Sequence, residues 1–144
     1  MAIRSGIAAT ANKEIVIARG HNIKGVSQLP LVLDDALEGV QKTKEIEDIF
    51  TKIGVWADVE RADRKKVRAG RGNMRGRGKK IGRGPLIVVS EDKGISKAAR
   101  NLPGVDVTVL RNLNAELLAP GANAGRLVIW AKSAFTALDE TWEE

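Results

Sequence analysis

The residues best suited to chemistry in this sequence are the cations between Arg61 and Gly84. This run, RADRKKVRAGRGNMRGRGKKIGRG, holds eleven lysines and arginines and one acid, Asp63. Arginine grips phosphate through a planar fork, and the interleaved glycines let the backbone pass close to a crowded surface. The pattern predicts a phosphate-binding segment. Its cations are Arg61, Arg64, Lys65, Lys66, Arg68, Arg71, Arg75, Arg77, Lys79, Lys80 and Arg83.

The positive charge of the protein is confined to this run. Its local charge is +10, whereas the remainder has thirteen bases and seventeen acids, for a charge of −4. A solvated flexible linker is the alternative interpretation. It is disfavoured because the apolar strand that follows Gly84 needs burial with partners from both sides of the run. Binding of a polyanion is therefore the favoured interpretation.

The residue types within the run narrow the choice of polyanion. Only Val67, Met74 and Ile81 interrupt the charge, too few apolar residues for a membrane-binding helix. The run contains no aromatic residue on which single-stranded bases could stack. We therefore expect a folded RNA, recognised by phosphate contacts and shape. The aromatic residues outside the run are Phe50, Trp56, Trp130, Phe135 and Trp142.

Other candidate chemistry is sparse. The glycines of the run match neither the GxGxxG nor the GxxxxGK[ST] phosphate motif. The only histidine, His21, has no nucleophile or metal ligand beside it, so we expect local hydrogen bonding or an RNA contact. The acid pairs Asp34-Asp35 and Glu91-Asp92 could bind Mg²⁺ at a sheet edge, although helix-start residues are the favoured interpretation. An enzyme acting on a phosphorylated substrate, with the run as a mobile lid, stays open as an alternative.

The composition indicates one domain of 144 residues, with residues 61–84 inserted as an extended basic loop. Cysteine is absent, which excludes disulfides and thiolate metal sites and is compatible with a reducing compartment. No apolar run approaches the length of a membrane span, and MAIRSGIAATA lacks the apolar core of a secretion signal. We expect a soluble cytoplasmic protein without cofactor or metal.

Apolar runs alternate with segments of helical period, which predicts an α/β fold: a three-layer α/β/α sandwich on a roughly four-stranded, mainly parallel sheet. The second and fourth strands are continuously apolar and are expected at its centre. The predicted strands are Leu29–Leu33, Leu86–Val89, Val105–Leu110 and Leu127–Trp130.

Helical spacing predicts four helices around this sheet. The first has Ile3, Ile7 and Ala11 on its inner stripe. The second begins with Thr43 as N-cap and ends at Gly54, the third is broken by Pro103-Gly104, and the last runs from Ser133. Their apolar stripes are Ile46, Ile49, Phe50 and Ile53; then Ile95, Ala98, Ala99 and Leu102; then Phe135, Leu138 and Trp142.

A resemblance to a known family rests on a succession of short segments in colinear order. These are IRSGIAATAN, ARGH, KTKEI, ADRKKVRAGRGNMRGRGKK, GPLIVV, AARNLPGVDV, LNAELLAPG and GRLVIW. The chain resembles the C-terminal portion of the universal large-subunit ribosomal protein number four family, in its archaeal and eukaryotic branch. The resemblance implies a non-catalytic structural protein that binds large-subunit ribosomal RNA (rRNA) early in assembly, as a monomer beside neighbouring ribosomal proteins.

Family members have a further N-terminal part with a long basic loop that reaches the wall of the nascent-peptide exit tunnel. We expect this chain to be a fragment without that part, so the tunnel role is not carried over. The residues that match the family's glycine-arginine stretch are Arg64, Lys65, Lys66, Arg68, Arg71, Asn73, Arg75, Arg77, Lys79 and Lys80. Secondary RNA contacts are expected from Arg4, Arg19, His21 and Asn22. A non-ribosomal regulator that binds messenger RNA through the same loop stays open.

Overall fold

Four parallel strands form the central sheet of the protein, whose computed structural model describes residues 1–138. The strands are β1 (Leu31–Leu33), β4 (Leu86–Val89), β5 (Asp106–Val109) and β6 (Val128–Ala131), and a separate pair is formed by β2 (Lys66–Val67) and β3 (Lys79–Lys80). The α-helices are α1 (Ala2–Ala11), α2 (Lys13–Arg19), α3 (Thr43–Lys52), α4 (Trp56–Asp63), α5 (Arg71–Met74), α6 (Ile95–Ala99), α7 (Ala115–Leu118) and α8 (Lys132–Thr136). Short 3-10 helices are η1 (Asp35–Gly39), η2 (Leu110–Asn112) and η3 (Pro120–Ala122).

The strand order in the main sheet is β1-β6-β4-β5, and all three pairings are parallel. β4 and β6 occupy the centre, and every residue of both is buried. This confirms the interpretation of the two continuously apolar runs, because a strand covered on both faces has no position for a polar side chain. β1 begins after Pro30, whose missing N–H makes it unsuitable for a ladder position.

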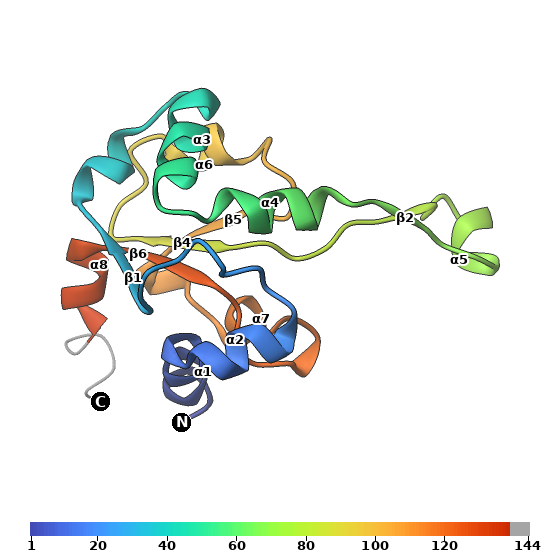
Figure 1. Ribbon diagram of the computed structural model, residues 1–144, viewed down its shortest axis with the longest axis horizontal. Coiled ribbons are helices and arrows are strands. Elements are labelled where there is room, and N and C mark those ends of the chain that lie inside the picture. Colours follow the sequence, from blue (N-terminus) through green and yellow to red (C-terminus); the bar gives the residue numbers. More distant parts are fainter. Residues whose placement is uncertain (139–144) are drawn as a thin grey trace.

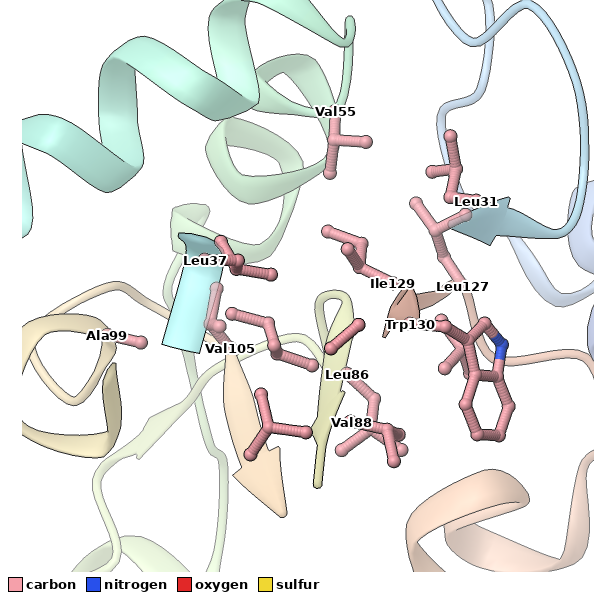
Figure 2. Close-up of a cluster of buried hydrophobic side chains, with 14 of the residues drawn as sticks. Leu31, Leu37, Val55, Leu86, Val88, Ala99, Val105, Leu127, Ile129 and Trp130 are labelled. Carbon is pink, nitrogen blue, oxygen red and sulfur yellow. The ribbon is translucent and has the colours of Figure 1, made fainter. Parts of the chain in front are cut away.

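Helices cover both faces of the sheet, which confirms the three-layer α/β/α architecture. Figure 1 shows α3, α4 and α6 on one side of the strands and α1, α2, α7 and α8 on the other. Figure 2 shows side chains from the α3 side, Val55 and Leu37, in one hydrophobic cluster with Ile129 and Leu86 of the central strands. The indole of Trp130 forms an edge-to-face contact with Phe135 of α8, with ring centroids 6.0 Å apart.

The predicted helices exist, with corrections at particular residues. Thr43 is not the N-cap of α3: Lys42 takes that position, and the Thr43 hydroxyl donates to the carbonyl of Ala98 at 2.9 Å. Ala11 is exposed at the end of α1 because the chain turns there into α2, so it does not continue the inner stripe. Trp142 lies outside the described residues.

Four α-helices of the described residues were not anticipated from the sequence: α2, α4, and the single turns α5 and α7. The side chain of Asn12 caps α2 by accepting from the N–H of Glu14, and Gly20 ends this helix in the left-handed conformation. α4 extends to Asp63, so the first three residues of the basic run are helical. No helix among residues 1–138 combines the length and the apolar character needed to cross a bilayer.

Candidate nucleic-acid interface

The middle of the basic run, residues 64–81, forms a hairpin that we call the arm. β2 and β3 pair antiparallel, with Lys66 opposite Lys80 and Val67 opposite Lys79. The ladder continues outward, where the N–H of Arg68 donates to the carbonyl of Gly78 at 2.9 Å. Figure 1 shows the arm extending away from the sheet and its helices, with α5 at its far end.

The tip of the arm is one helical turn held by backbone hydrogen bonds. Gly70 and Gly76 flank it with φ of 75° and 76°, a conformation that suits glycine. The N–H of Arg77 donates to the carbonyl of Gly72 at 3.0 Å and closes the turn. Glycine thus permits the sharp reversals that a hairpin of arginines needs.

The cations of the arm are exposed, and most of their side chains make no hydrogen bond or ion pair within residues 1–138. Lys65 alone lies near an acid, with Nζ 3.7 Å from Oδ1 of Asp63, and both side chains are at least half exposed. Such a pair contributes little to stability. The unpartnered cations are Arg64, Lys66, Arg68, Arg71, Arg75, Arg77, Lys79 and Lys80, and Asn73 is exposed among them.

The inner end of the run is different, because its cations are bound into the protein. We call the cluster of Asp58, Arg61, Arg83, Asp106 and Arg126 the foot of the arm. Fully buried Asp58 accepts from the Nε of Arg61 at 2.8 Å, and its other oxygen lies 2.8 Å from the Nδ1 of His21. Since Asp58 is an acceptor, Nδ1 of His21 carries the proton in this contact.

These hydrogen bonds determine the ionisation of Asp58. Burial by itself would raise the pKa of the Asp58 carboxyl, but the side chains of His21 and Arg61 and the backbone N–H of Asn22 stabilise the carboxylate and lower its pKa. The Nη2 of Arg61 also donates to the carbonyl of Arg83 at 2.6 Å. Arg61 therefore ties the outgoing chain of α4 to the chain that returns from the arm.

Arg126 forms the second half of the foot. Its side chain is 1% exposed and donates to the carbonyls of Gly84 at 3.0 Å and Gly104 at 3.3 Å, and to Oδ2 of Asp106 at 2.6 Å. Burial lowers the pKa of Arg126, and the hydrogen bond and charge of Asp106 oppose that change. Arg83, which is exposed, shares the same Asp106 oxygen at 3.2 Å.

Close backbone contacts complete the foot. The N–H of Gly82 donates to the carbonyl of Ala62 at 3.1 Å, and the N–H of Gly84 donates to that of Gly104 at 2.8 Å. Gly104 has a φ of 74°, and a Cβ there would lie 2.6 Å from the carbonyl oxygen of Gly82. Only glycine fits this position, so the returning chain is packed directly against the loop after α6.

A cleft of about 1240 Å³ lies between the arm and the body of the domain. It exceeds the roughly 300–1,000 Å³ of a small-molecule pocket, so its size favours a macromolecular ligand. Nine lysines and arginines and three acids line it, which makes it suitable for an anion. The cations are Arg19, Arg61, Lys65, Arg68, Lys79, Lys80, Arg83, Arg100 and Arg126.

The residues outside the basic run that were predicted to contact RNA lie in different parts of the protein. Arg19 lines the cleft and donates to the carbonyls of Pro120, at 3.0 Å, and Asn123. Partial burial and the nearby charge of Arg61 lower its pKa. His21 lines the cleft as well, but its side chain is 2% exposed and bound to Asp58, so local hydrogen bonding describes it. Asn22 also binds Asp58, through its backbone N–H.

Arg4 lies apart from these residues, on the exposed side of α1.

Two arginines of the cleft were not predicted from the sequence as site residues. Arg100 follows α6 and is exposed at the cleft wall, and nothing in its local pattern distinguishes it from a solvated surface cation. Arg126 directly precedes the apolar run of β6, and a lone arginine against a buried strand is a signal for a buried ion pair.

The acid pairs lie at the carboxyl ends of the strands, where they bind the protein's own backbone. Asp35 accepts from the N–H of Ser133 at the start of α8, and Asp92 accepts from the N–H groups of Gly94 and Ser96 at the start of α6. These contacts fit the helix-start interpretation. Among the described residues, no group of three or more His, Asp or Glu side chains is placed to hold a metal ion.

Buried Glu38 occupies the crevice between the ends of β4 and β6. Its Oε1 accepts from the N–H of Ser90 at 2.8 Å, and its Oε2 lies 3.2 Å from Nζ of Lys93. In open α/β sheets this crevice is the usual place for a ligand. Here the carboxylate of the chain itself takes the N–H group that an anionic ligand would use.

The fold and this surface define a class of protein: an α/β/α domain that carries a cationic arm and a basic cleft at the arm's foot. A model of the family described as "Ribosomal protein L4/L1 family" matches residues 1–141. The chain belongs to this family. This confirms the resemblance noted from the sequence.

Individual relatives agree with the family assignment. The chain is 50% identical over 145 residues to large ribosomal subunit protein uL4 of Methanosphaera stadtmanae, with 100% of this chain and 56% of the relative covered. It is 53% identical over 140 residues to uL4 of Archaeoglobus fulgidus, covering 96% and 55%. For uL4A of Schizosaccharomyces pombe the identity is 46% over 142 residues, covering 98% and 39%.

These relatives are named as ribosomal proteins and not as enzymes, which contradicts the alternative of an enzyme with a mobile lid. They come from archaea and a eukaryote, in agreement with the expected branch of the family. The chain spans about half the length of the archaeal relatives that it matches.

Proposed function

We propose that this chain is part of a structural protein of the large ribosomal subunit and binds large-subunit rRNA through the arm and the adjoining cleft. In this role it supports subunit assembly in the cytoplasm, as a monomer among neighbouring ribosomal proteins. The observation that carries the proposal is the contrast within the basic run. The arm holds eight cations that have no partner among residues 1–138, directly beside a cleft lined by nine lysines and arginines.

Phosphate contacts account for most of the expected affinity. Bringing so many like charges together in a hairpin destabilises it, and an RNA backbone removes this repulsion while its condensed counterions are released. If about six cations of the run contact phosphates, the logarithm of affinity falls with the logarithm of salt concentration with a slope of about −4 to −5. The glycines allow the arm to fit closely between RNA helices.

The other predicted residues support this interface in different ways. Arg61 and Arg83 fix the foot and present their remaining donors to the cleft. His21 and Asn22 position Asp58, which in turn orients Arg61. Arg19 and Arg100 form the opposite wall. Arg4 on α1 provides a separate contact remote from the cleft.

The test is binding of the full chain to large-subunit rRNA, measured by filter retention between 0.1 and about 0.5 M salt. The fourfold variant R68Q/R71Q/R75Q/R77Q removes four arm charges. We expect it to reduce the steepness of the salt dependence by about 3, and to lower affinity at 0.15 M salt roughly 100-fold.

A matched variant, K13Q/K44Q/K52Q/K132Q, removes four exposed cations from helices of the body. It should leave affinity within about threefold of the unaltered chain, because these lysines lie outside the arm and the cleft. Equal losses in the two variants would mean that net charge alone drives binding. A salt response close to flat for the unaltered chain would contradict the proposed phosphate contacts.

A further inference from the structure

The arm has two faces, and both carry cations. Successive residues of a strand point to opposite sides, so Arg64 and Lys66 share one face while Lys65 and Val67 share the other. The hollows of the surface separate these cations in the same way, although Arg68, which the alternation places on the side of Lys66, lines the large cleft. Lys65 and Lys79 line the large cleft, whereas Arg64 and Lys66 line a second hollow of about 410 Å³.

We call the side of Lys65 and Lys79 the cleft face and the side of Arg64 and Lys66 the outer face. Opposite the cleft face is the body of the domain, with Arg19 and Arg100 on its wall. The second hollow is lined by residues of the run alone: Arg61, Arg64, Lys66, Lys80, Ile81 and Gly82. A ligand on the outer face is therefore held by the arm and its base without the body wall.

The outer face contains a like-charged pair that needs an anion. Lys66 and Lys80 are directly opposite in the ladder, which places their Cβ atoms about 5 Å apart on one side of the hairpin. Like charges in this position destabilise a hairpin, and no acid among residues 1–138 is paired with either lysine. One phosphate between the two ammonium groups would neutralise the repulsion.

An RNA strand in the cleft does not satisfy this pair fully. Lys80 borders both hollows, as do Arg61, Ile81 and Gly82. Lys66 and Arg64 line the outer hollow alone, and Lys65 and Lys79 line the cleft alone. The side chains of Arg64 and Lys66 are exposed to solvent. A ligand restricted to the cleft would leave the charges of Arg64 and Lys66 uncompensated.

We propose that the arm binds two separate stretches of RNA backbone at once, one in the cleft between arm and body and one on the outer face at Arg64, Lys66 and Lys80. This inference rests on the proposed rRNA binding and adds a function to it. The arm would connect two RNA segments across its own thickness, so that the protein fixes their relative position.

The test is hydroxyl-radical footprinting of large-subunit rRNA bound to the full chain. Two variants remove two charges each from opposite faces: R64Q/K66Q from the outer face and K65Q/K79Q from the cleft face. We expect each variant to lose one set of protected nucleotides and to keep the other. We also expect each to reduce the steepness of the salt dependence by about 1.5, the value for two phosphate contacts.

The control K44Q/K52Q, on exposed positions of α3, should keep both sets. Loss of the same nucleotides by both face variants, or full protection with R64Q/K66Q, would overturn the inference while leaving rRNA binding intact. Absence of any protection by the unaltered chain would instead overturn the proposed function, and the two-sided arm with it.

Discussion

The foot and the arm both carry arginines, but these charges have different partners. At the foot, Arg61 and Arg126 bind carboxylates and carbonyls of the protein, and Arg126 is almost completely buried. Along the arm, Arg71, Arg75 and Arg77 are exposed, and their side chains have no partner in the described part of the chain. Within the basic run, the inner cations Arg61 and Arg83 therefore stabilise the foot, whereas the cations of the arm remain available for a ligand.

This comparison has an energetic basis. A buried guanidinium is tolerated only when its donors are satisfied, and removing it leaves its partners desolvated and unpaired. An exposed guanidinium contributes almost nothing to the free energy of folding. Repulsion from neighbouring cations slightly destabilises the folded arm. Substitutions at the foot should therefore lower stability, whereas substitutions in the arm should change RNA affinity with little effect on stability.

The strongest test of the foot is Arg126→Met. The substitution keeps much of the apolar stem but removes the donor to the Gly84 carbonyl, and one of the two donors both to Asp106 and to the Gly104 carbonyl. We expect the free energy of unfolding in urea to fall by about 3–5 kcal/mol. As a control, Arg100→Met removes an exposed arginine and should change it by less than about 0.5 kcal/mol. A loss below about 1 kcal/mol for Arg126→Met would break the distinction between foot and arm.

Asp58→Asn should have the next largest effect, about 2–3 kcal/mol at pH 7, because it leaves His21 and Arg61 without their carboxylate. The pKa of Asp58 is lowered by folding, so its contribution is fully present above about pH 4, near the ordinary carboxyl pKa, and is lost as pH falls through the folded value. The difference between the unaltered protein and the variant in urea unfolding should shrink from pH 5 toward pH 2.5.

Asp63→Asn serves as the control for this pH series. Its carboxylate is 56% exposed and lies 3.7 Å from Lys65, so its removal should cost almost nothing at any pH. A constant difference for Asp58→Asn across the acidic range would show that the carboxylate form of Asp58 is not what stabilises the foot.

The smallest effect on stability is expected in the arm. R68Q/R71Q/R75Q/R77Q, which should weaken RNA binding strongly, should change the free energy of unfolding by no more than about 0.5 kcal/mol, and any change should be a gain from relieved repulsion. Thermal and urea unfolding of the full chain would measure it. A loss of about 2 kcal/mol or more would mean that the arm cations also hold the fold together.

The sequence predicted the sheet well because continuous apolar runs leave few alternatives for β4 and β6. It also located the exposed cations of the arm, since charge density needs no tertiary information. It could not separate Arg61 and Arg83 from the arm, because their partners Asp58 and Asp106 become neighbours only through the packing of α4 and β5. Arg100 was missed for the same reason: a cleft wall is a property of the fold and not of the local pattern.

The glycine contacts at the foot determine how precisely the arm is oriented relative to the rest of the domain. With about 3.3 Å per residue, a hairpin of eighteen residues reaches up to roughly 25 Å, so a tilt of about 5° at its origin displaces the tip by about 2 Å. The hydrogen bonds of Gly82 to Ala62 and of Gly84 to Gly104 fix that origin within a backbone contact that admits no side chain. The foot thus fixes the direction of the arm, and its stiffness sets how precisely the arginines at the tip can be placed against the phosphates of the proposed RNA ligand.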